Sequence, residues 1–167
     1  MKEYSISDVR VINSSRVWET KSKAQLRVLV REQIGWVSQV FLRIRAESWE
    51  ISGQDLRGLR LYTVRRIPKD SVGGKEFHRL RWEFILALEG KIHFILEDLR
   101  KNKKEIIVTA ENGVLLPPYV LHTYTALEEN SGLLVLCNTD FEPENPKTHD
   151  TFSEEEFQKL QAQTANE

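Results

Sequence analysis

The apolar residues of this chain fall in short runs rather than in long amphipathic stretches. Runs of four to nine residues rich in Val, Ile, Leu, Phe and Tyr are separated by Gly, Pro, Asn or pairs of charged residues. The gaps between runs are too short for the crossover helices of a parallel α/β fold. We predict strands at residues 8–12, 25–31, 36–45, 59–66, 82–88, 91–98, 104–109, 113–117, 121–126 and 132–138. The pattern therefore predicts an all-β domain of the sandwich or jelly-roll type.

One helix is indicated near the end of the sequence. Ser153 precedes Glu156 by three positions, which is the spacing of a capping box. Phe157 and Leu160 then supply a thin apolar stripe. We divide the chain into an N-terminal arm over 1–35, a barrel over 36–140, and a C-terminal loop and helix over 141–167, all in one domain.

The charge balance excludes a general attraction to polyanions. The 167 residues carry 24 Lys and Arg against 25 Asp and Glu, for a net charge of -1. Such a chain has no basic field for nucleic acid or an anionic membrane. Cys137 is the single cysteine, which excludes an intramolecular disulfide. No stretch reads as a signal peptide or a membrane helix, so we expect a cytoplasmic protein.

Two clusters of polar residues carry chemistry. The first lies within residues 73–90, where Glu76, His78 and Glu83 stand two and five residues apart. Residues two apart on a strand share a face, so Glu76 and His78 are expected to point into one cavity. The second lies within residues 113–127, where two consecutive prolines precede His122.

These clusters resemble the two motifs of the cupin superfamily. Glu76 occupies the position of the first motif histidine, His78 that of the second, Glu83 that of the glutamate and Gly90 that of the closing glycine. His122 occupies the histidine position of the second motif. The resemblance implies a cupin double-stranded β-helix, which is a jelly-roll barrel, with extra N-terminal strands and the site inside the barrel's mouth. Glu76 departs from the motif, because the family places histidine there.

A narrower resemblance covers residues 57–152. Arg60-Leu61-Tyr62 lies 18 residues before His78, and sugar-nucleotide 3,4-ketoisomerases place an Arg-Val-Tyr element similarly. The segments ILEDLRKNKKE and LLPPYVLHTY are similar to segments of dTDP-4-dehydrorhamnose 3,5-epimerases, and FEPENPKTHDTF is similar to the tail of a cupin domain fused to a capsule-sugar reductase. The sequence thus resembles the RmlC-like cupins of the nucleotide-sugar group, which include WxcM-like proteins.

This resemblance implies an isomerase or epimerase acting on a nucleotide-linked, dTDP-type 4-keto-6-deoxyhexose in deoxysugar or surface-polysaccharide biosynthesis. Such an enzyme removes a proton next to the ketone. The catalytic residues implied are His78 as base and Tyr62 as proton donor. Glu76 stands where these enzymes have a histidine, so either it acts as the second acid or base, or the activity has changed or been lost. Burial disfavours the charged form of His78 and a neighbouring carboxylate favours it, so sequence does not fix the net effect.

A nucleotide diphosphate also needs local cations in a chain without net positive charge. The residues that we expect to bind substrate are Arg60, Arg66, Glu83, His122 and Tyr124. Arg79 and Arg81 alternate with His78, so a regular strand would place them on the opposite face.

Two other functions remain open at this point. Glu76, His78, Glu83 and His122 offer two imidazoles and two carboxylates, a set that suits zinc, iron, manganese or nickel. The isomerase interpretation itself requires no cofactor. The other alternative is a non-catalytic cupin that binds a sugar or other small ligand. We also expect a homodimer in which residues 1–35 are exchanged or docked between subunits, covering a sheet edge.

Overall fold

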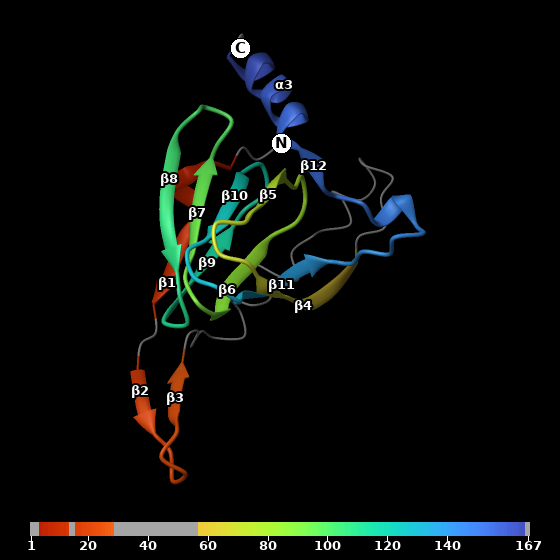
Figure 1. The fold of residues 1–167 in the computed structure, drawn as a ribbon. Helices are drawn as coiled ribbons and strands as arrows, with labels where there is room; N and C mark the ends of the chain where they lie inside the picture. Colours follow the sequence, from red (N-terminus) through yellow and green to blue (C-terminus); the bar gives the residue numbers. More distant parts are fainter. Residues whose placement is uncertain (1–3, 14–15, 29–56, 166–167) are drawn as a thin grey trace.

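The computed structural model describes residues 4–13, 16–28 and 57–165. Two five-stranded antiparallel sheets pack face to face, and a separate two-stranded hairpin projects away from them (Figure 1). The elements are η1 (Ile6–Asp8), β1 (Arg10–Asn13), β2 (Arg16–Glu19), β3 (Gln25–Val28), β4 (Arg57–Ile67), β5 (Val72–Phe77), β6 (Glu83–Glu89), β7 (Ile92–Glu97), β8 (Lys103–Val108), β9 (Asn112–Leu116), β10 (Leu121–Ala126), β11 (Ser131–Thr139), η2 (Pro146–Thr148), β12 (Phe152–Ser153) and α3 (Glu154–Thr164). The first sheet has the order β1-β9-β6-β11-β4 and the second β12-β5-β10-β7-β8.

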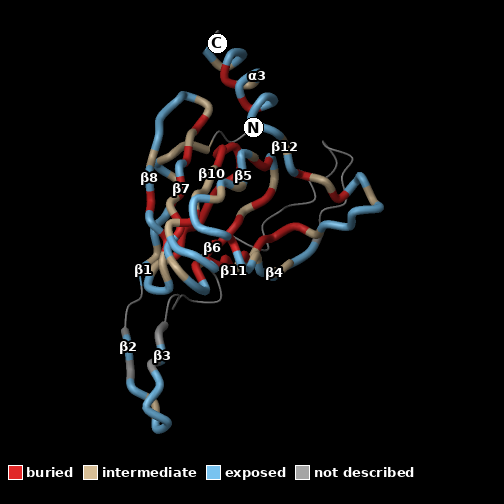
Figure 2. The backbone as a smooth tube through the Cα atoms, viewed as in Figure 1, coloured by how far each residue is buried: buried red, intermediate tan, exposed pale blue. Residues whose placement is uncertain are grey.

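Strand alternation builds the core between the sheets. On β6 the side chains of Ile85 and Ala87 point inward, and on β11 those of Leu133 and Val135 do the same. The facing sheet supplies residues such as Phe94, which is fully buried. Figure 2 shows the buried stretches concentrated on the two sheets, whereas the β2–β3 hairpin is mostly exposed where its burial is described. This arrangement confirms the predicted all-β jelly roll.

The predicted strands mostly agree with those observed, and β1 to β3 are the expected extra N-terminal strands. The predicted strand over 36–45 lies outside the described residues. The predicted strands did not include β5, because the two glycines of its sequence VGGKEF are typical of a loop, although the argument for Glu76 and His78 assumed a strand there. The predicted strands also did not include β2 and the two-residue strand β12. The domain limits at 35 and 140 stay predictions.

The C-terminal helix is confirmed together with its cap. The Ser153 hydroxyl accepts a hydrogen bond from the Glu156 backbone N–H at 3.3 Å, and the Glu156 carboxylate accepts one from the Ser153 N–H at 2.9 Å. Phe157 is fully buried, with its ring centroid 5.1 Å from that of Phe77 on β5. The helix is therefore anchored to the strand that carries Glu76. In the described part of the chain, no helix combines the length and apolarity needed to cross a membrane.

Candidate functional site

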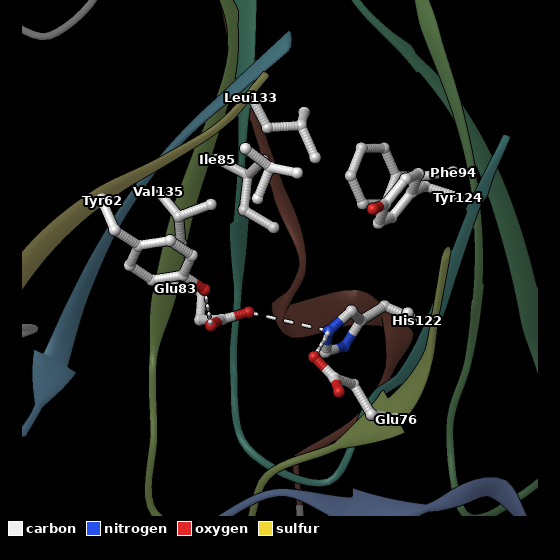
Figure 3. A pocket seen from close by; sticks show the side chains of 11 residues that line it. Tyr62, Glu76, Glu83, Ile85, Phe94, His122, Tyr124, Leu133 and Val135 are labelled. Carbon is white, nitrogen blue, oxygen red and sulfur yellow. Dashed lines mark hydrogen bonds and ion pairs between the residues drawn. The ribbon is translucent and has the colours of Figure 1, made fainter. Parts of the chain in front are cut away.

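A cavity of about 170 Å³ lies between the two sheets. It is polar at one end, where Tyr62, Glu76, Glu83 and His122 meet, and apolar or aromatic at the other (Figure 3). The lining residues are Tyr62, Val64, Gly74, Glu76, Glu83, Ile85, Phe94, His122, Tyr124, Leu133 and Val135. Pockets that enclose a drug-sized ligand measure roughly 300–1,000 Å³. The cavity can therefore enclose only part of such a ligand.

The pairing of β5 with β10 places two functional side chains together. Glu76 and His122 are direct register partners, and the ladder is irregular between His122 and Thr123. At this irregularity Gly74 has φ +74°, and a Cβ there would lie 2.6 Å from the carbonyl oxygen of His122. Glycine is needed at this position both for its conformation and for the close approach of β10.

Glu76 and His122 form an ion pair on the cavity wall. Nε2 of His122 lies 3.8 Å from Oε1 of Glu76 and 3.7 Å from Oε2 of Glu83, while its Nδ1 donates to the Val120 carbonyl at 3.3 Å. Burial opposes charge on His122, but the two carboxylates outweigh it and raise its pKa. The facing imidazole lowers the pKa of Glu76. The cavity therefore presents the Glu76 carboxylate beside an imidazole whose charged form is favoured.

Glu83 connects both sheets at the polar end. Its Oε1 accepts a hydrogen bond from the Tyr62 hydroxyl at 3.3 Å, and its Oε2 lies 3.5 Å from Nε2 of His78. Burial opposes ionisation of Glu83, but His78, His122 and Arg81 outweigh it, so the pKa of this carboxyl lies well below its usual value. Burial and the Glu83 charge raise the pKa of Tyr62. Tyr62 is therefore a neutral hydroxyl donor.

His78 lies beside the cavity but does not line it. The ring is nearly fully buried, its Nδ1 donates to the Asp150 carbonyl at 2.6 Å, and its Nε2 faces Glu83. Strand β5 ends at Phe77, so His78 already belongs to the following bend instead of continuing the strand. Sequence reasoning brought His78 into the right cluster, but the regular strand it assumed does not continue. Its catalytic role stays a prediction.

Arg81 is a site residue that the sequence analysis placed on the wrong face. Its side chain is 3% exposed, and its Nη1 lies 3.5 Å from Nε2 of His78 and 3.6 Å from Oε1 of Glu83. Its Nε donates to the Thr139 hydroxyl at 2.8 Å. The alternation failed because residues 78–82 do not form a strand. No local sequence pattern could have revealed this inward turn.

The predicted substrate-binding arginines are placed differently from one another. The Arg60 guanidinium lies over the Tyr62 ring at 4.9 Å and over the Phe141 ring at 5.2 Å, next to the polar end. Arg66 is exposed and does not line the cavity. It has φ +59° where the pairing of β4 with β11 shifts register, and this bulge turns it away from the face of Tyr62.

Tyr124, which we expect to bind substrate, lines the cavity. Its ring packs beside Phe94 with centroids 5.7 Å apart. Burial and the charge of Glu76 raise the pKa of its hydroxyl, so Tyr124 is a second neutral donor. Gly73 on β5 makes room for the ring, because a Cβ at this position would lie 2.3 Å from the Tyr124 hydroxyl oxygen.

Three of the four predicted metal ligands form a compact group. One ligand atom from each of Glu76, His78 and His122 lies within 4.8 Å of the others. Both histidines donate Nδ1–H to backbone carbonyls, which leaves Nε2 toward the shared space, as in metal sites. The buried cation of Arg81 lies 3.5 Å from Nε2 of His78, however, and would repel a divalent ion. The three residues supply donor atoms of the kinds that bind metals, but the positive charge of Arg81 opposes the binding of a cation.

The fold of this chain is similar to those of several solved structures. The structure is similar to a 3,4-ketoisomerase from Helicobacter canadensis, with a TM-score of 0.63, 14% identity, and coverage of 93% of this chain and 98% of that chain. It is similar to a mutant of the 3,4-ketoisomerase QdtA from Thermoanaerobacterium thermosaccharolyticum in complex with TDP-4-keto-6-deoxyglucose, with a TM-score of 0.64, 17% identity and 96% coverage of both chains. The epimerase RmlC from Legionella pneumophila matches with a TM-score of 0.59 and 14% identity, over 90% of this chain and 74% of that one.

The sequence comparisons assign the family. A protein named glycerol kinase from Bdellovibrio bacteriovorus is 31% identical over 91 residues, which are 53% of this chain, and the match spans only 17% of that protein's length. Residues 49–156 match the family described as FdtA: WxcM-like, C-terminal. The matched segment covers more than half of the chain and contains every residue of the polar cluster. This chain is therefore a member of the FdtA family of WxcM-like C-terminal domains.

Proposed function

We propose that this protein isomerises or epimerises a dTDP-linked 4-keto-6-deoxyhexose by removing a proton from the carbon next to the ketone. The observation that carries the proposal is the Glu76–His122 ion pair, which meets the Tyr62 hydroxyl at the polar end of a cavity that is apolar or aromatic at its other end. Family membership supports it, as do similar structures that are 3,4-ketoisomerases and 3,5-epimerases crystallised with TDP or TDP-sugars.

We assign proton removal to Glu76 instead of His78. Glu76 lines the cavity and its side chain is 38% exposed, whereas both ring nitrogens of His78 face protein atoms. In the proposed step the Glu76 carboxylate takes the proton from the carbon, and the electron pair moves onto the ketone oxygen. The His122 imidazolium or the neutral hydroxyl of Tyr62 or Tyr124 stabilises this enolate. In an epimerisation, the proton returns to the opposite face of the same carbon. In an isomerisation, the neighbouring hydroxyl also gives up its proton, the former ketone oxygen takes one up, and the carbon proton returns to the former ketone carbon.

The cavity volume indicates which part of the substrate enters the site. Because about 170 Å³ is too small for a whole nucleotide sugar, the sugar ring occupies the cavity and the nucleotide lies outside it. Arg60 lies beside Tyr62 and is the arginine best placed to meet the diphosphate. We expect Arg66 to contribute nothing to binding.

Solvent-deuterium exchange tests the proposal directly. The protein is incubated with dTDP-4-keto-6-deoxyglucose in D₂O, and label is followed by NMR at each sugar carbon. Exchange is expected with the intact protein and should be lost in Glu76→Gln. Glu105→Gln is the matched control, because Glu105 forms a similar pair with His93 at 2.9 Å but is exposed outside the cavity. If the intact protein binds dTDP and never exchanges label, the non-catalytic alternative replaces this proposal.

A metal-dependent function is the second candidate, and the carbonyl-anchored histidines favour it. A metal held by Glu76, His78 and His122 would act as a Lewis acid on the ketone oxygen. Metal analysis of the purified protein tests this candidate. Stoichiometric zinc, iron, manganese or nickel, with exchange lost after chelation, would favour it over metal-free catalysis.

We also propose that the protein is a cytoplasmic homodimer acting in deoxysugar or surface-polysaccharide biosynthesis. Strand β1 forms one edge of the first sheet and the β2–β3 hairpin projects from it, so this region is suited to contact a second subunit. Light scattering tests the dimer, and a monomer at micromolar concentration would contradict it.

A further inference from the structure

Asp150 links the C-terminal segment to the bend behind the cavity. This residue follows η2, is fully buried and lies about seventy positions from its partners in sequence. Its carboxylate accepts hydrogen bonds from the backbone N–H groups of Arg79, Leu80 and Arg81 at 3.0, 3.0 and 2.8 Å. Its backbone carbonyl accepts the bond from Nδ1 of His78 at 2.6 Å. One residue thus holds four consecutive positions of the bend.

These four hydrogen bonds determine which atoms of His78 and Arg81 face the site. A carbonyl oxygen can only accept, so Nδ1 of His78 carries a proton and Nε2 faces Glu83. Holding the Arg81 N–H turns that residue inward, where its guanidinium lies 3.6 Å from Oε1 of Glu83. Both side chains therefore reach the same buried carboxylate.

Glu83 carries the effect into the cavity. It accepts the hydrogen bond from Tyr62 and lies 3.7 Å from Nε2 of His122, and both of these partners line the cavity. A change in the bend can therefore reach the cavity by two routes, through Glu83 and through the His78 ring, whose centroid lies 5.3 Å from that of His122. Asp150 itself does not touch a ligand on either route.

We propose that Asp150 is a positioning residue, which holds the 78–81 bend so that His78 and Arg81 orient Glu83 against Tyr62 and His122. The expected loss of kcat rests on the proposed function, whereas the orientation of Glu83 by the bend does not. The proposal gives the C-terminal segment, which lies outside both cupin motifs, a role in the site.

Asp98 provides a matched control for a purely structural carboxylate. It is also buried, at 1% exposure, and it organises a turn by accepting bonds from the N–H groups of Ile6, Arg100 and Asn102 at 3.0, 3.0 and 2.9 Å. It does not line the cavity. Asp98→Asn and Asp150→Asn thus replace one accepting oxygen by an NH2 donor at two places, and only the Asp150 position leads to Glu83.

Nitrogen NMR of the histidine side chains tests the proposal without requiring activity. The chain has four histidines, so single variants assign every ring signal. Asp150→Asn is expected to shift the signals of His78 and His122 and to leave His93 unchanged, while Asp98→Asn leaves both site signals in place. Unchanged His78 and His122 signals in folded Asp150→Asn, or equal shifts in Asp98→Asn, would overturn the proposal.

Deuterium-exchange kinetics provide the second measurement. Misplacing catalytic groups by about 1 Å can cost about 100-fold in rate. We expect Asp150→Asn to lose kcat on that scale with little change in KM, and Asp98→Asn to keep both. If the intact protein shows no exchange, the proposed function fails, and the NMR measurement still decides the role of Asp150.

A second variant pair covers the case in which Asp150→Asn does not fold. Arg81→Met leaves the Asp150 carboxylate and its three N–H partners in place but removes the buried guanidinium. Arg79→Met is its control, because the Arg79 side chain is exposed and lies over the Phe152 ring at 4.2 Å. Shifts of the His78 and His122 signals in Arg81→Met alone support the proposal. Unchanged signals in both variants contradict it.

Discussion

Replacing Gly73 by alanine tests how closely β5 must approach the aromatic wall of the cavity. An added Cβ would lie 2.3 Å from both Cζ and the hydroxyl oxygen of Tyr124, whereas ordinary contact begins at 3.4 Å. The ring must therefore move by the difference, about 1 Å. Overpacking of this kind costs about 1–3 kcal/mol. At about 2–4 °C per kcal/mol for a chain of this size, the melting temperature should fall by about 2–12 °C.

The same displacement should affect the reaction. A shift of about 1 Å in a group that contacts substrate can cost about 100-fold in rate, so deuterium exchange should fall on that scale. Urea unfolding followed by circular dichroism measures the free energy of unfolding, thermal unfolding measures the melting temperature, and NMR measures the exchange.

Gly132→Ala is the matched control for Gly73→Ala. Gly132 also lies in a strand, but a Cβ there would be 3.4 Å from the Val64 carbonyl oxygen and 3.8 Å from its other neighbours. Alanine is less flexible than glycine in the unfolded chain, which would stabilise the protein by about 0.4–1 kcal/mol. This gain would offset most of the energetic cost of the tight contact with Val64. Equal stability of the Gly73→Ala and Gly132→Ala proteins would refute the argument from close approach.

Three further predictions concern packing, hydrogen bonding and pH. Phe157→Ala removes a fully buried ring and should cost about 3–5 kcal/mol in urea unfolding, while a cost below about 1 kcal/mol would mean that α3 is not anchored. Tyr62→Phe leaves the buried Glu83 without its hydroxyl donor and should cost about 1–3 kcal/mol in the same assay, with exchange slowed. The raised pKa of His122 means that its contribution to stability is complete below its ordinary value of 6.5 and is lost as pH rises through the folded-state pKa. Stability should therefore fall as pH rises above 6.5 and through the raised pKa of His122. This decrease should be smaller in Glu76→Gln; an unchanged decrease would contradict the ion pair.

The sequence predicted those features that depend on local pattern. Runs of β-branched and aromatic residues located most of the described strands, and the Ser153–Glu156 spacing located the helix and its cap. Motif spacing brought Glu76, Glu83 and His122 to one cavity. These signals succeed because strand alternation and capping depend on neighbours only a few positions apart.

The missed features depend on partners that are distant in sequence. Strand β5 was missed because it contains two glycines, which are typical of loops. These glycines are required by the close approach of β10, which lies about fifty positions away in the sequence. The inward turn of Arg81 depends on Asp150 and Thr139, which lie 69 and 58 positions away. A regular strand through His78 was the simplest local assumption, and the bend stabilised by Asp150 overrode it.

The glutamate at position 76 has an electrostatic consequence that connects these features. With histidine there, as in the cupin motif, the polar end of the cavity would contain one carboxylate, Glu83. Glu76 adds a second negative charge, and two carboxylates in a partly buried site destabilise one another unless cations face them. His122 faces both carboxylates, and Arg81 faces Glu83 from behind, so two negative charges meet two positive charges. Arg81 reaches that position because Asp150 turns its backbone inward. The departure at Glu76 is therefore compensated within the fold, which favours the ionised form of both carboxylates, as the proposed role of Glu76 as a base requires.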